Sequence, residues 1–205
     1  MTTTFTKNYD SSQYTRAVAT SVVPSQLTGG VGSGYLTQDQ LVPFVGRYRW
    51  PTIGGNLGTL SSLGTNKTLV SGTVYVADIF IPLASVTLTG IGVLNGATVG
   101  TNNGLVSLYD SNGNLLANSA LAGALTSGAN TFQQYAFTAT YTTIKPGRFW
   151  VGYQANGTTD TIRTVATATW IDLLTTSTAG TFGTLPAVTP PTTFTADVGP
   201  VAYVY

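Results

Sequence analysis

The alternation of hydrophobic and polar positions predicts β-strands along the chain from residue 42 onward. Residues 73–81 carry apolar side chains on both alternating faces, so this strand is predicted to be buried on both sides. Residues 86–94 form the next predicted strand, in which Gly90 and Gly92 indicate a bulge or a close approach of the backbone. Further strands are predicted at residues 105–110, 114–118, 132–141, 148–155, 161–169 and 198–205.

Turn signals separate these segments at short intervals. Ser111-Asn112-Gly113 indicates a hairpin, because Asn-Gly tolerates positive φ angles. Lys145-Pro146-Gly147 and Asn156-Gly157 are further predicted turns. Good helix formers are scarce, since the chain contains no Glu and one Met. The predicted fold class is therefore all-β, an antiparallel jelly-roll-like β-sandwich of eight or so strands.

The first 45 residues differ from the rest, because they are polar, rich in glycine and without clean periodicity. We interpret residues 1–45 as an extended N-terminal arm for assembly or anchoring, and residues 46–205 as the β-sandwich domain. A disordered leader is the alternative for residues 1–45. The glycines between residues 29 and 34 lack the spacing of a dinucleotide-binding fingerprint, which leaves a flexible hinge as their predicted role.

The composition narrows the classes of function. Among 205 residues there are 15 charged side chains with a net charge of +1, and there is no His and no Cys. A Ser-His-Asp or Cys-His catalytic group is therefore excluded, as is a cysteine-ligated metal site. Eight scattered basic residues do not form a stripe that binds nucleic acid. We expect no enzyme activity, no cofactor, no metal, no nucleic-acid partner and no membrane insertion. The near-zero charge favours an assembly.

Two groups of side chains contain the oxygen atoms needed for glycoside hydrolysis or for calcium binding. The aspartates at positions 78, 110, 160, 172 and 197 could supply a carboxylate pair for glycoside hydrolysis, but their spacing does not indicate one. The run from Asp110 to Asn114 begins like a calcium loop. That loop requires Gly at position 115 and Glu at position 121, and both positions hold Leu. A hairpin turn explains the same residues.

Tryptophans supply the candidate contact residues. On the strand at residues 148–155, Phe149 and Tyr153 share one face and Trp150 lies on the other. If Phe149 and Tyr153 point into the core, Trp150 points outward or toward a second subunit. Trp170 and Asp172 are two positions apart, so on a strand they would share a face. Trp150, Trp170 and Asp172 are therefore the candidate interface or glycan contacts, and a role in the core is the alternative.

Several short segments together resemble a known group of proteins. These segments are Arg47-Tyr48-Arg49-Trp50-Pro51, the run from Lys145 to Gln154, the run from Thr189 to Thr195, and Val198-Gly199-Pro200-Val201-Ala202. Over roughly residues 46–205 the chain resembles the β-sandwich virion structural proteins of tailed bacteriophages, which include head decorations, head fibres and tail appendages. The group has no catalytic motif, so the resemblance transfers no active-site residue.

The resemblance implies a location in the virion, after assembly in the host cytoplasm. It implies a homotrimer that contacts the major capsid protein or another virion protein, and a role in stabilising the capsid as a surface decoration or head fibre. The alternative that it implies is a tail appendage that binds a carbohydrate or receptor on the host surface. In both cases the expected partners are other virion proteins, further copies of the chain or a host glycan.

Overall fold

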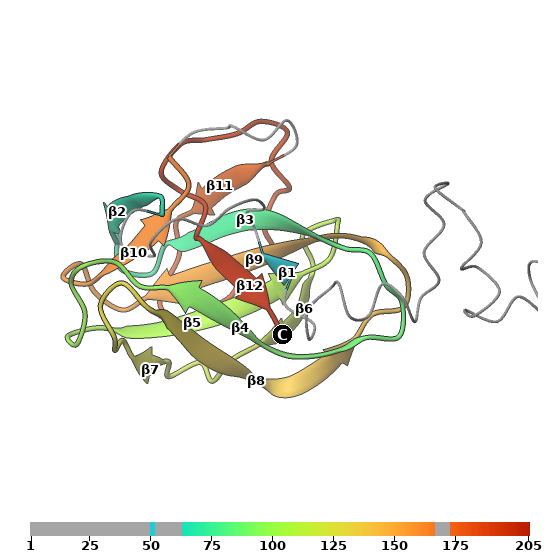
Figure 1. Ribbon diagram of the computed structural model, residues 1–205, viewed down its shortest axis with the longest axis horizontal. Coiled ribbons are helices and arrows are strands. Elements are labelled where there is room, and N and C mark those ends of the chain that lie inside the picture. The colour runs from blue at the N-terminus through green and yellow to red at the C-terminus, as the bar shows by residue number, and fades with distance from the viewer. Residues whose placement is uncertain (1–49, 52–62, 167–172) are drawn as a thin grey trace, which may run out of the picture. The chain divides into compact units, whose positions relative to one another are not determined.

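The computed structural model describes residues 50–51, 63–166 and 173–205 (Figure 1). Within these residues every regular element is a strand and none is a helix. The predicted arm at residues 1–45 lies outside the described residues, as do Trp170 and Asp172. The described residues belong to one compact unit, Tyr48–Tyr205.

The strands form three sheets in which all pairs are antiparallel. The four-stranded sheet has the order β1 (Trp50–Pro51), β12 (Ala202–Val204), β4 (Thr87–Leu94), β8 (Phe132–Thr142). The six-stranded sheet has the order β11 (Thr175–Thr178), β3 (Val74–Ile81), β9 (Gly147–Ala155), β5 (Asn103–Tyr109), β6 (Leu115–Asn118), and β7 (Ala124–Leu125) also pairs with β5. A small sheet joins β10 (Thr161–Thr164) to β2 (Thr65–Thr68). The predicted all-β, antiparallel sandwich class is confirmed; the jelly-roll connectivity stays a prediction.

Aromatic rings fill the space between the two larger sheets. Tyr135 of β8 meets Tyr153 of β9 edge to face, with ring centroids 6.0 Å apart. Tyr141 and Phe149 make a second such contact across the sheets at 6.1 Å. Rings in this geometry contribute about 0.5–1.5 kcal/mol beyond the burial of their area. Phe149 and Tyr153 therefore point into the core between the sheets, as one face of the predicted strand should.

The other face of the six-stranded sheet is also covered, and this corrects the expected orientation of Trp150. Trp150 is only 2 % exposed and packs in a cluster with Val74, Val76, Tyr109 and Val188. Val188 comes from the irregular segment between β11 and β12, which lies over this face. The sheet is thus buried on both sides, which is consistent with the largely apolar β3 and with the burial of β9 from Phe149 to Ala155.

Glycines mark the two places where the sequence predicted unusual backbone. The register between β4 and β8 shifts between Leu88 and Gly90, which confirms the expected bulge. A side chain at Gly92 would overlap the ring of Tyr203, so the close approach is confirmed as well. In the hairpin between β5 and β6, Gly113 has a φ of 84°, a conformation that favours glycine.

The later strands are shorter than the pattern predicts. The segment predicted at residues 161–169 is a strand only at Thr161–Thr164, and the last strand is Ala202–Val204 rather than residues 198–205. Twelve strands are present in the described residues instead of about eight, because several elements have only two to four residues. Short edge elements of this kind are made by long-range pairing, which local periodicity does not report.

Candidate functional site

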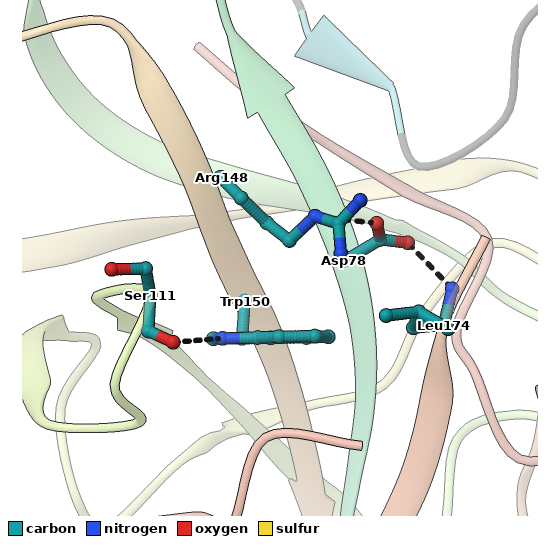
Figure 2. A network of polar contacts seen from close by, with 5 residues as sticks. All are labelled: Asp78, Ser111, Arg148, Trp150 and Leu174. Carbon is teal, nitrogen blue, oxygen red and sulfur yellow. Dashed lines mark hydrogen bonds and ion pairs between the residues drawn. The ribbon is translucent and has the colours of Figure 1, made fainter. Parts of the chain in front are cut away.

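An ion pair lies beside Trp150 on the covered face of the six-stranded sheet (Figure 2). The Nε of Arg148 is 3.3 Å from a carboxylate oxygen of Asp78, and Trp150 is the direct cross-strand neighbour of Asp78. The other carboxylate oxygen of Asp78 accepts a hydrogen bond of 2.9 Å from the backbone N–H of Leu174. The indole N–H of Trp150 donates a long hydrogen bond, 3.4 Å, to the carbonyl of Ser111. These contacts tie β3, β9 and the start of β11 together.

The three residues predicted from the sequence as contacts separate into two groups. Trp150 lies inside the core and offers no ring face to a glycan on this surface. Trp170 and Asp172 lie outside the described residues. The structure therefore brings Trp150 together with Asp78 and Arg148. Trp150 and Asp78 are buried and the Arg148 side chain is 39 % exposed, so the group is a structural contact at the margin of the core.

Asp160 is the most buried carboxylate among the described residues, with an exposure of 0 %. It accepts hydrogen bonds from the backbone N–H of Asn102, at 2.8 Å, and from that of Thr101. The hydroxyl of Thr126 donates to the same carboxylate. In return, the side-chain oxygen of Asn102 accepts the backbone N–H of Asp160 at 2.9 Å. The group locks three connections at one end of the sandwich together.

Asp110 occupies the hairpin in which a calcium loop was considered. One oxygen of its carboxylate accepts the backbone N–H groups of Asn112 and Asn114, at 2.8 and 2.9 Å. The other accepts the side-chain amide of Asn114 at 2.9 Å. Desolvation raises the pKa of Asp110, but these hydrogen bonds outweigh it and hold the pKa below its ordinary value. The carboxylate is thus turned onto its own hairpin, and the described residues contain no group of three acidic, His or Cys side chains placed to hold a metal.

Burial shifts the ionisation of the interior tyrosines. It raises the pKa of Tyr135 to about 12, and the charge of Asp160 adds to the rise. Burial also raises the pKa of Tyr153, with further increases from Tyr135 and Asp160. Because a phenolate in the core would lose its hydration, these residues stay protonated over the whole physiological range. Their position between the sheets gives them a role in packing.

Three of the exposed large hydrophobic side chains among the described residues lie along one edge of the six-stranded sheet, at residues 115–125. The side chains of Leu121 and Leu125 are 49 % and 54 % exposed, and Leu115 is also exposed. The three alanines at positions 120, 122 and 124 are exposed between them. We call residues 115–125 the apolar edge. In Figure 1, β6 and β7 lie at the two ends of this segment.

A second exposed apolar site lies where β3 ends and β9 begins. Phe80 is 61 % exposed and Ile144 is 85 % exposed. Thr143 lies between β8 and β9 and is hydrogen-bonded to the connection that follows β3. Its hydroxyl donates to the carbonyl of Leu83, and its backbone N–H donates to the carbonyl of Val86. Lys145 follows Ile144, and Arg148 is the cross-strand partner of Phe80. We call Phe80 and Ile144 the apolar tip; it differs from the apolar edge in having cations beside it.

Sequence reasoning missed the apolar edge, although a signal was present. Residues 120–125 read Ala-Leu-Ala-Gly-Ala-Leu, six apolar residues in a row just after a hairpin. Connections between strands are usually polar, so an apolar run outside a predicted strand indicates a surface that something covers. The apolar tip gave a weaker signal, since Phe80 belongs to a strand that is otherwise buried on both faces.

Comparison of the chain with protein-family models, with curated proteins and with solved structures gives no match. In the described residues, no helix is long and apolar enough to cross a membrane. The functional conclusion therefore rests on the geometry and on the residues themselves.

Proposed function

We propose that this chain is a non-enzymatic structural subunit of a bacteriophage virion, displayed on the particle as a capsid decoration or head fibre. The apolar edge carries the part of this proposal that concerns contacts between subunits, because it exposes leucines on a chain that has few charges, and the sequence resemblance carries the virion location. Apolar patches of this kind on a soluble domain are typical of protein–protein contacts. In this role the contacts between subunits stabilise the particle, and the chain needs no cofactor.

The same proposal assigns parts to the two regions of the chain. The sandwich supplies the contacts between copies, in a homotrimer, and residues 1–45 anchor it to the major capsid protein or another virion protein. The resemblance of residues 46–205 to virion proteins of tailed bacteriophages supports the location. The rigid interior supports a protein that works outside the cell, since both faces of the larger sheet are covered.

A receptor-binding tail appendage is the alternative function. This alternative requires the rings of Trp150 and Trp170 to be exposed and to stack on a sugar. Trp150 is buried and is not available for that contact. The alternative therefore has less support than the structural role.

Purified particles of the virus that encodes the chain provide the test. We expect mass spectrometry to find the chain in the particles, and antibody labelling in electron microscopy to place it on the outside. Particles that lack the chain would refute the proposal. A chain without residues 1–45 should keep the circular dichroism spectrum of the sandwich but no longer join the particle, and normal incorporation would contradict the anchoring role.

A further inference from the structure

We infer that the apolar edge, residues 115–125, packs against the same segment of a second copy of this chain. The inference rests on the proposed function and names the surface through which its subunits meet. Three observations support it: the exposure of the leucines, the hydrogen bonding of the backbone, and the distribution of charge.

The first observation concerns exposure. Each residue from 120 to 124 is Ala, Leu or Gly, and Leu125 ends the run within β7. Leu121 and Leu125 leave about half of their surface in contact with solvent. Covering apolar surface is favourable by roughly 25 cal/mol per Å². When the apolar edges of two copies pack together, Leu121 and Leu125 of each copy are covered, so the burial of four leucine side chains stabilises the contact.

The second observation concerns the backbone of the same segment. The carbonyl of Ala120 accepts the N–H of Gly123 at 2.9 Å. The side-chain amide of Asn103 donates to the carbonyl of Ala122 at 3.2 Å, and that of Gln133 donates to the carbonyl of Leu125 at 2.9 Å. A buried carbonyl without a partner costs about 1–3 kcal/mol. Because these carbonyls already have donors within the chain, another apolar surface can cover the segment without that penalty.

The third observation selects the occupant. No charged residue occurs between Ser111 and Ile144, so the apolar edge contains no charge at all. Charge complementarity is the usual means of selecting a different protein, and this surface offers none. Further copies of the chain can bring the same segment together there without like-charge repulsion, as at the axis of the proposed homotrimer. The apolar tip differs, because Lys145 follows Ile144 and two copies that met there would bring two lysines close together.

The test measures the mass of the full chain in solution by light scattering, with paired substitutions. We expect the parent to be an oligomer and the Leu121→Asp/Leu125→Asp variant to fall to the mass of one chain. The matched control, Phe80→Asp/Ile144→Asp, adds the same charges at the apolar tip and should stay oligomeric. An edge variant that remains oligomeric would overturn the inference while leaving the proposed function standing. A parent that is a monomer at all concentrations would overturn the inference together with the proposed homotrimer, while the location in the virion is tested by the particles themselves.

A milder variant covers the case in which the aspartates prevent folding. The chain has no cysteine, so Leu121→Cys and Ile144→Cys each introduce a single thiol. Contact between copies should make the thiol at position 121 react more slowly with a maleimide at high protein concentration than after dilution, whereas the rate at position 144 should not depend on concentration. This protection should disappear on dilution as the oligomer dissociates. A reaction rate at position 121 that does not change with protein concentration would contradict the contact.

Discussion

Replacing Asp160 by Asn should destabilise the protein more than any other change of one carboxylate among the described residues. Three donors converge on this buried carboxylate: the backbone N–H groups of Thr101 and Asn102 and the hydroxyl of Thr126. A hydrogen bond to a charged group contributes about 1.5–3 kcal/mol, and a buried donor left without a partner costs about 1–3 kcal/mol. The Asn side chain is uncharged, and its NH₂ group would face the N–H and hydroxyl groups that now donate to the carboxylate. We therefore expect a loss of about 3–5 kcal/mol in the free energy of unfolding.

The assay is urea denaturation at neutral pH and fixed protein concentration, followed by circular dichroism and tryptophan fluorescence. Asp110→Asn is the matched control, since the Asn oxygen can still accept the backbone N–H groups of the exposed hairpin. The control should lose less than about 1 kcal/mol. If Asp160→Asn lost no more than the control, the carboxylate would not hold the three connections together, and the reasoning would be refuted.

Three further predictions follow from the interior and the hairpin. Gly104→Ala should destabilise the fold by about 1–3 kcal/mol, because the new methyl group would overlap the Tyr153 hydroxyl and lie 2.8 Å from that of Tyr135; a smaller cost in a Tyr153→Phe background is the check, and an unchanged cost would contradict the clash. The raised pKa of Tyr135, about 12 against an ordinary value of 10.0, means that the free energy of unfolding is at its full value below pH 10 and falls as the pH rises toward 12. Absorbance of tyrosinate and loss of circular dichroism should therefore appear together, and full stability at pH 12 would exclude this. The lowered pKa of Asp110 predicts the opposite dependence: its contribution is present above the ordinary pKa of 3.8 and is lost as the pH falls further. Urea midpoints measured from pH 6 to pH 3 should fall less for Asp110→Asn than for the parent, and parallel curves would argue against the hydrogen-bonded carboxylate.

The elements predicted best from the sequence were those whose signal is local. The hairpin at Asn112-Gly113 needs a positive φ at one position, and the sequence places glycine there. Gly90 and Gly92 correctly indicated a close approach of the backbone, because a strand interior rarely holds two glycines unless another group lies against them. The largely apolar strand from Val74 to Ile81 indicated burial on both faces, and among its residues only Phe80 is exposed.

The elements predicted least well depend on contacts between distant segments. Trp150 was placed on the face opposite to Phe149 and Tyr153, outward or toward a second subunit, with a role in the core as the alternative, and the structure shows the core role. Val188 covers it from 38 positions further along the chain, in a segment without strand or helix periodicity. The surroundings of Asp160 were equally hidden, since its donors come from residues 58 and 34 positions away. No local pattern reports which connections meet at one end of a sandwich.

The scarcity of charge gives the apolar edge its meaning. Natural sheet proteins often place charged side chains, especially lysine, at their sheet edges, and these charges prevent the edges from associating with other proteins. The edge at residues 115–125 has no such protection, since its nearest charges in the sequence are Asp110 and Lys145. The two charges near Trp150 belong to Arg148 and Asp78, which form an ion pair with each other on another part of the sheet. An unprotected apolar edge is a liability in a free monomer and an advantage in a subunit whose edge is covered. The arrangement of these few charges therefore favours a protein whose function is assembly.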